Sequence, residues 1–242
     1  MPTNDGAAGP RSRRERPAKP ALSRQGIIDT ALAILRDEGL AKVTMRRVAA
    51  ALDSGHASLY VYVRDTEDLH AQILDALLGD IGVPAAADGD WRARMRTLLT
   101  EYGTLLARHP GIARMAMSTQ PTGPHYMALV EAVLALLHEG GVADAAAAWG
   151  VDLLLLYPTA IAVEHSNPKA DARRAEARTE LADRLAGADA RDHPHIARLG
   201  AALVSGTGRA RTDWALDVLL DGILAANART PEAEPGGTAA EE

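Results

Sequence analysis

Cysteine is absent from this chain of 242 residues. Without a thiol the chain has no disulfide framework, no cysteine-ligated zinc site and no cysteine nucleophile. The same absence is typical of proteins that work in a reducing cytoplasm. With 47% hydrophobic residues, the chain can instead bury a substantial core, as one large domain or two small ones.

Long apolar segments are also missing from the sequence pattern. Residues 1–20 contain no apolar stretch of the kind that a secretory signal needs. The richest later run, Val151–Tyr157, contains Asp152 and stops at Pro158, so it is too short to span a bilayer. We therefore expect a soluble, cytoplasmic protein with no membrane partner.

The sequence also lacks the common catalytic motifs. The sequence has no G-x-S-x-G elbow, no phosphate-binding loop and no H-E-x-x-H helix, and residues 206–208 indicate only a flexible turn. His193, His195 and His165 are the one conceivable metal set, but Pro194 separates the first two in an expected loop. We expect no catalytic residue, no metal and no cofactor. An enzyme is the alternative class, which turnover or metal content would support.

Helical periodicity is what the sequence has instead. An apolar stripe that Ser23 can cap and Gly39 can end consists of Ile27, Ile28, Ala31, Leu32 and Leu35. Two short helices follow, and a fourth helix starts at Asp65. Beyond a linker at 85–90, the spacing predicts helices over 91–107, 112–117, 126–138, 143–157 with a continuation to 165, 170–185, 196–204 and 212–228. No segment alternates as a strand does, so the expected class is all-α.

Charge is unevenly distributed along the chain. The formal net charge of −6 argues against a general nucleic-acid binder. Yet a basic cluster precedes the first helix, made of Arg11, Arg13, Arg14, Arg16 and Lys19. Such an arm can meet DNA phosphates even on an acidic body, because only the contacting face has to attract them. The alternative is a solvated tail.

Two short helices joined by a tight turn at 53–55 are the central feature. Thr44 can cap the first of them, and Leu59 can pack the second against it. In a helix-turn-helix, the first helix fixes the angle at which the second enters the major groove. The alternative is a helical hairpin in which Tyr60 and Tyr62 pack in the core.

The residues of this region resemble a known family. The stretch from 27 to 69 reads IIDTALAILRDEGLAKVTMRRVAAALDSGHASLYVYVRDTEDL. It is similar to the N-terminal domain of the TetR family of transcriptional regulators in Gly39, Thr44, Val48-Ala49, Ser58-Leu59-Tyr60, Tyr62-Val63 and Leu69. Further along, His109-Pro110 and WALDVLLDGILA at 214–225 resemble the ligand domain and last dimerisation helix of one branch of that family.

The resemblance implies a fold and a function. It implies a three-helix DNA-binding domain with a helix-turn-helix, followed by a helical ligand-binding and dimerisation domain. It further implies a homodimer that binds double-stranded, palindromic operator DNA and is released by a small, largely apolar ligand. A repressor is the first expectation, and activation stays open. The expected divisions are a disordered basic arm at 1–21, the DNA-binding domain at 22–69, a connecting helix and linker at 70–90, the ligand-binding domain at 91–228 and a disordered acidic tail at 229–242.

Residue roles are carried over position by position. The exposed faces of the two helices and the resemblance together predict DNA contacts at Thr44, Arg46, Arg47, His56, Ala57, Ser58, Tyr60, Val61, Tyr62 and Arg64. Three departures from the family pattern stand out: Asp53 replaces a turn glycine, Ser54 a small aliphatic residue, and Thr66 a phosphate-binding lysine. Asp tolerates the left-handed conformation, so we expect the turn to survive.

Bulky residues of the middle helices can line a ligand pocket or can be plain core. The pocket interpretation names Tyr102, Met115, Met117, Tyr126, Trp149, Leu153 and Tyr157, with Glu164 and His165 as a conceivable polar anchor. The expected dimer interface is Leu216, Leu219, Leu220, Ile223 and Leu224. A helical adaptor that binds only proteins is the remaining alternative, and a DNA-binding assay on the purified protein separates it from a regulator.

Overall fold

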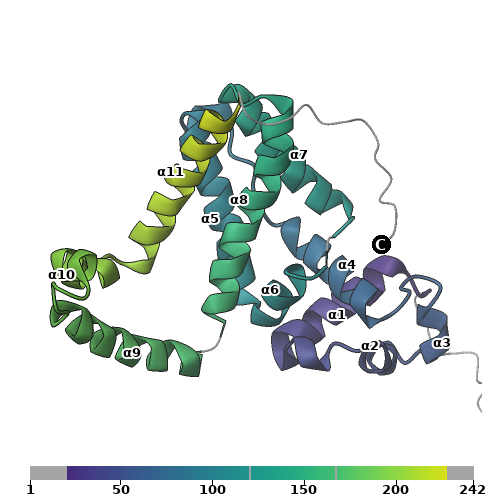
Figure 1. Cartoon of the computed structure of the whole chain (residues 1–242). Helices are drawn as coiled ribbons and strands as arrows, with labels where there is room; N and C mark the ends of the chain where they lie inside the picture. The colour runs from purple at the N-terminus through teal and green to yellow at the C-terminus, as the bar shows by residue number, and fades with distance from the viewer. Residues whose placement is uncertain (1–20, 120, 167, 228–242) are drawn as a thin grey trace, which may run out of the picture.

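The computed structural model describes residues 21–119, 121–166 and 168–227, with 168–172 as backbone only. Within these ranges every regular element is a helix, which confirms the all-α class (Figure 1). The expected acidic tail and all of the basic arm except Ala21 lie outside the described residues.

The N-terminal unit consists of short helices whose ends follow local sequence signals. They are α1 (Arg24–Glu38), the 3-10 turn η2 (Leu40–Lys42), α2 (Met45–Ala51), α3 (His56–Leu59) and α4 (Thr66–Leu78). Ser23, Thr44 and Asp65 each accept a backbone N–H of the helix that they precede. Gly39, at φ +82°, ends α1 in a conformation that favours glycine. The predicted helix starts at Ser23, Thr44 and Asp65 and the stop at Gly39 are therefore confirmed, whereas α4 ends at Leu78, before the expected stop at Gly82.

The C-terminal part packs around one long helix, α8. Its elements are η3 (Ala86–Asp88), α5 (Trp91–Arg108), α6 (Pro110–Ala116), α7 (Pro124–Glu139), α8 (Asp144–Glu164), α9 (Pro168–Ala186), α10 (Pro194–Leu199), η4 (Gly200–Val204) and α11 (Gly208–Ala226). Helix α8 contacts α5, α6, α7 and α11 (Figure 1). It continues through Pro158, as expected, and α5 meets that proline closely at Gly103.

The length of α8 corrects one expectation. Its 21 residues and a mean hydropathy of 1.6 make it long and apolar enough to cross a membrane, because the helix extends well beyond the run Val151–Tyr157. In the structure 44% of its most apolar window is buried, and the core helix of a soluble protein meets the same criterion. The cytoplasmic location stays a prediction.

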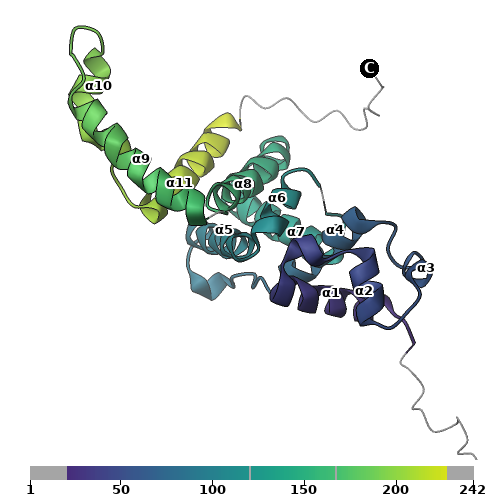
Figure 2. The same cartoon turned by 90° about the horizontal axis from the view of Figure 1, so that it is seen from below.

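Helices α9 and α10 and the turn η4 form an arm that projects from the body (Figures 1 and 2). The arm folds on itself, with α9 against η4 and α10. Arg178 of α9 donates hydrogen bonds to the carbonyls of Val204 and Gly206. The expected turn at 206–208 leads directly into α11: Gly206 has a φ of +84°, and the Thr207 hydroxyl caps the helix by accepting the N–H of Ala210 at 3.1 Å.

Candidate functional site

The turn between α2 and α3 has the predicted backbone conformation. Asp53 stands at φ +47°, the one positive φ of a non-glycine residue in the described part of the chain. The N–H of Ser54 donates to the carbonyl of Ala49 at 3.0 Å, which closes the turn. The expectation that Asp53 replaces a turn glycine without loss of the turn is thus confirmed.

The segment after the turn exposes a continuous set of side chains. Leu59 is 0% exposed and anchors the segment in the core, while Val61 is 79% exposed. Regular helix ends at Leu59, so α3 is shorter than expected and residues 60–62 continue as turns. Exposed on this surface, which we call the recognition face, are His56, Ala57, Ser58, Tyr60 and Val61. An exposed Tyr beside an exposed Val has no role in the core of this protomer.

Tyr62 belongs to the packing instead. Its side chain is half-buried against the core, and its hydroxyl donates to the carbonyl of Leu22 at 2.8 Å. Tyr62 therefore holds the end of residues 56–62, which we call the recognition segment, to the start of α1. The prediction that it faces DNA with Tyr60 does not fit this placement, because side chains two residues apart point in different directions here.

The basic residues around the turn differ in what they contact. Arg47 pairs with Glu38 at 2.5 Å, and its hydrogen bond lowers the pKa of the Glu38 carboxyl. Arg46 is exposed and has no hydrogen-bond or ion-pair partner among the described residues. Arg64 is exposed beside Asp68, with 3.6 Å between its Nε and the carboxylate. Arg46 is thus the arginine of α2 that is available to an external partner.

A cavity of about 460 Å³ lies between α4 and the helices of the C-terminal part. Three predicted pocket residues, Tyr102, Met117 and Tyr126, do line it. The other lining residues are Leu74, Leu78, Ala116, Ser118, Thr119, Pro121, Asp152, Leu155, Leu156 and Thr159. These ten residues lie in the stretch of the chain from α4 to α8. The sequence did not predict them, because no sequence signal distinguishes a side chain that lines a cavity from one that packs in the core.

Polar groups in this cavity are fixed by neighbours. The Thr159 hydroxyl donates to the carbonyl of Leu155 at 2.8 Å, so the Tyr102 hydroxyl, 2.9 Å away, donates to Thr159. Burial raises the pKa of Tyr102. Burial, and then the negative charge of Asp152, also raises the pKa of Tyr126. Both phenols therefore stay protonated, and the cavity combines leucine side chains with several hydroxyls and the carboxylate of Asp152.

The other predicted pocket residues lie elsewhere. Met115 packs against the core outside this lining. Trp149 and Leu153 are exposed on another face of α8. Tyr157 lines a separate opening of about 1070 Å³ between α8, α11 and the arm, together with Glu164 and His165. The periodicity of α8 does not reveal this division, because the helix is apolar on nearly every side.

Three of the five predicted dimer residues point into their own protomer. Leu216 and Leu220 are each 1% exposed and Ile223 is also buried, all within one protomer. Ile223 packs onto Gly150 of α8, so this face of α11 contacts its own chain. The predicted Leu219 and Leu224 are partly buried against the same core. Large apolar side chains are instead exposed along α8 and α11, and we call this set the apolar face: Trp149, Leu153, Leu156, Trp214 and Val218.

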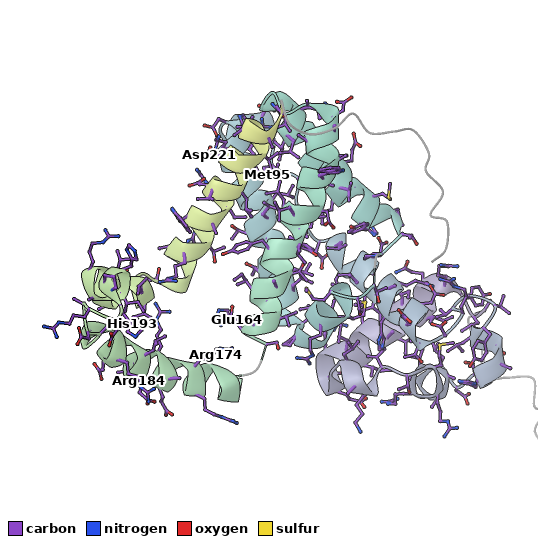
Figure 3. All side chains as sticks on the ribbon, in the orientation of Figure 1. Met95, Glu164, Arg174, Arg184, His193 and Asp221 are labelled. Atoms are coloured by element: carbon purple, nitrogen blue, oxygen red, sulfur yellow. The ribbon has the colours of Figure 1, made fainter. Side chains whose placement is uncertain are left out.

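Metal ligands do not gather among the residues that the structure describes: no group of three His, Cys, Asp or Glu side chains is placed to hold an ion. Figure 3 places His193 on the projecting arm and Glu164, the neighbour of His165, at the end of α8. The conceivable histidine set is therefore divided between separate parts of the molecule.

The combination of these features defines a class. A recognition face held on a helix-turn-helix, attached to a helical domain that contains a cavity, is the architecture of a helix-turn-helix transcriptional regulator. The sequence matches two family models: residues 27–73 match "Bacterial regulatory proteins, tetR family", and residues 83–226 match "Tetracyclin repressor-like, C-terminal domain". The chain belongs to the TetR family.

Individual relatives support this assignment. The solved structure of the transcription regulator SCO7704 from Streptomyces is 45% identical, with a TM-score of 0.70 over 90% of this chain and 100% of that one. The Streptomyces coelicolor protein ActR in complex with actinorhodin is 31% identical, with a TM-score of 0.75 over 87% and 99% of the two chains. The transcriptional repressor DrrR1 of Streptomyces coeruleorubidus is 36% identical over 133 residues, which are 54% of this chain and 49% of that protein. The match thus spans only about half the length of this curated relative.

Proposed function

We propose that this regulator is a repressor that binds a palindromic operator as a homodimer and releases it when a small, largely apolar ligand binds. The observation that carries the proposal is the recognition face, fixed in position by the buried Leu59 and the hydrogen bond of Tyr62. The name of the relative DrrR1 supports repression. We also infer a functional division close to the two matched ranges, with DNA binding in 22–69, a connection in 70–90 and ligand binding with dimerisation in 91–228.

The apolar face supports the dimer. Trp149 of α8 and Trp214 of α11 are 64% and 68% exposed, and both helices pack against each other within the protomer. Two adjacent helices with unburied apolar side chains can meet their symmetry mates in a four-helix arrangement. Such a dimer presents two recognition faces, which read two half-sites when they stand about 34–36 Å apart.

The cavity supports a small-molecule ligand. Its volume lies within the range of about 300–1,000 Å³ that is usual for such sites. Two protonated phenols beside leucine side chains suit an aromatic compound that also carries hydrogen-bonding groups. The complex of ActR with actinorhodin shows that one relative binds a ligand. By linkage, operator DNA should weaken ligand binding by the same factor by which ligand weakens operator binding, for a coupling of about 1–3 kcal/mol.

Selection from a random DNA pool tests the function. Purified full-length protein should enrich a two-fold symmetric sequence whose half-site centres are about one helical turn, or a multiple of it, apart. Enrichment of no sequence, or of a site without symmetry, would contradict an operator-binding dimer.

Arg46→Ala tests which side chain reads the operator. If Arg46 makes a bidentate base contact, the substitution should weaken operator binding by about 1–3 kcal/mol and relax the preference at one base pair of each half-site. Arg184→Ala removes the same charge from the projecting arm (Figure 3) and should leave operator binding unchanged. Titration of labelled operator, with thermal unfolding as the stability check, measures both. A large loss of stability in Arg46→Ala would instead place this residue in the fold.

Met117→Trp tests the cavity. A thermal-shift screen of aromatic compounds on the wild-type protein first finds a ligand, since ligand at 100 times its Kd adds about 2.7 kcal/mol to stability. The added indole should fill the lining and abolish this shift while operator affinity stays near the wild-type value. Met127→Trp is the matched control, because Met127 is exposed on α7 and does not line the cavity. An unchanged ligand shift in Met117→Trp would place the ligand elsewhere.

A further inference from the structure

A buried carboxylate joins α4 to the start of α7. Asp75 of α4 is only 8% exposed. Its Oδ1 accepts the backbone N–H of Tyr126 at 2.9 Å, and its Oδ2 lies 3.1 Å from Nδ1 of His125. Both partners stand in the first turn of α7, where backbone N–H groups have no acceptor within the helix and favour a negative charge. A side chain of one helix thus caps another that lies about 50 residues further along the chain.

The close approach depends on a glycine. Gly123 immediately precedes α7, and a Cβ atom built there would lie 2.1 Å from the carboxyl carbon of Asp75. Non-bonded atoms do not approach so closely, so any other residue at this position must displace the carboxylate or the helix end. We call the contact that Asp75 makes with Gly123, His125 and the backbone N–H of Tyr126 the clasp.

The clasp lies between the cavity and the recognition segment. On one side, Tyr126 lines the cavity beside Leu74 and Leu78, which are neighbours of Asp75 on α4. On the other side, α4 contacts the backbone of the DNA-binding domain. Nε2 of His70 is 2.9 Å from the carbonyl of Val43, just before α2, and Nε2 of Gln72 donates to the carbonyl of Tyr62 at 3.4 Å.

We propose that the clasp is the positioning contact through which the cavity controls operator binding, and that opening it releases the operator. The inference rests on the proposed function, because it assigns the transmission step to named residues. A ligand that widens the cavity separates Tyr126 from Leu74, and this displacement pulls the Tyr126 N–H away from Asp75. A buried carboxylate without its donors is costly, so the clasp has a closed state and an open, rehydrated state rather than a continuum. Because His70 and Gln72 link α4 to Val43 and Tyr62, the opened helix carries the recognition segment with it.

Gly123→Ala tests this inference without touching DNA or cavity. The added methyl should open the clasp as a ligand does and weaken operator binding by about tenfold or more. Gly208→Ala is the matched control, because a Cβ at Gly208 meets no atom within 4 Å and this glycine likewise stands at the N-terminal end of a helix, as the first residue of α11. Since the chain has no native cysteine, a spin label on Asp37→Cys reports the spacing of the two DNA-binding domains in the dimer. This spacing should change in Gly123→Ala and not in Gly208→Ala.

Substitutions of Asp75 test the clasp independently, and they remain informative if the Gly123→Ala protein fails to fold. Asp75→Ala removes the cap and should weaken operator binding by about tenfold or more. Asp75→Asn keeps an oxygen that can accept the Tyr126 N–H, so it should restore operator binding close to the wild-type value. Wild-type operator affinity in Asp75→Ala, or an equal loss in Asp75→Asn and Asp75→Ala, would overturn the clasp. Failure of the wild-type protein to bind any operator would overturn the proposed function instead.

Discussion

Trp149→Lys is expected to produce monomers and to abolish operator binding at concentrations that saturate the wild-type protein. Trp149 is 64% exposed on the apolar face beside Leu153, so a second copy of the chain would cover it. A lysine placed there would lose its hydration without gaining a partner. Specific operator complexes have a Kd of about 10⁻⁸–10⁻¹¹ M. A monomer contacts one half-site instead of two and so loses about half of the binding free energy, which weakens binding by about 10⁴-fold or more.

Sedimentation analysis and operator titration measure the two effects separately. Val83→Lys is the control, because Val83 is an equally exposed apolar residue outside the apolar face. It should leave both the dimer and operator binding intact. A wild-type protein that is monomeric at micromolar concentration, or a Trp149→Lys protein that stays dimeric, would contradict the assignment of this face.

Leu59→Ala is expected to destabilise the DNA-binding domain by about 2–5 kcal/mol. Leu59 is fully buried and is the residue through which α3 packs on the core, so its truncation leaves a cavity under the recognition face. Operator binding should fall together with stability. Chemical denaturation and operator titration on the same samples test this.

Val61→Ala is the matched control for the loss of stability. Val61 is an exposed aliphatic residue two positions further along, so its truncation should change the free energy of unfolding by less than about 0.5 kcal/mol. It should still weaken operator binding, because an exposed aliphatic side chain on a recognition face can contact a thymine methyl. Equal destabilisation by both substitutions would show that the recognition segment packs in another way.

Local signals in the sequence determined the boundaries of the N-terminal helices. Ser23, Thr44 and Asp65 cap helices as predicted, and Asp53 adopts the left-handed turn. Capping and turn geometry depend on a few neighbouring residues, and these are visible in any linear sequence. The resemblance of residues 27–69 also identified the family, since the helix-turn-helix concentrates its characteristic residues in one short segment.

Only the tertiary structure decided which faces of α8 and α11 lie inside. Both helices are apolar on more than one side, so the 3.6-residue period cannot indicate which stripe packs within the protomer and which is left for a second copy. For this reason the sequence predicts Leu216 and Leu220 in the dimer interface although they are buried in the core, and Trp149 in the cavity although it is exposed. Most of the cavity lining, and all of the clasp, could not be predicted either. Asp75 meets Gly123 and Tyr126 only because α4 and α7 pack together, and no local pattern encodes a contact between residues that far apart in the chain.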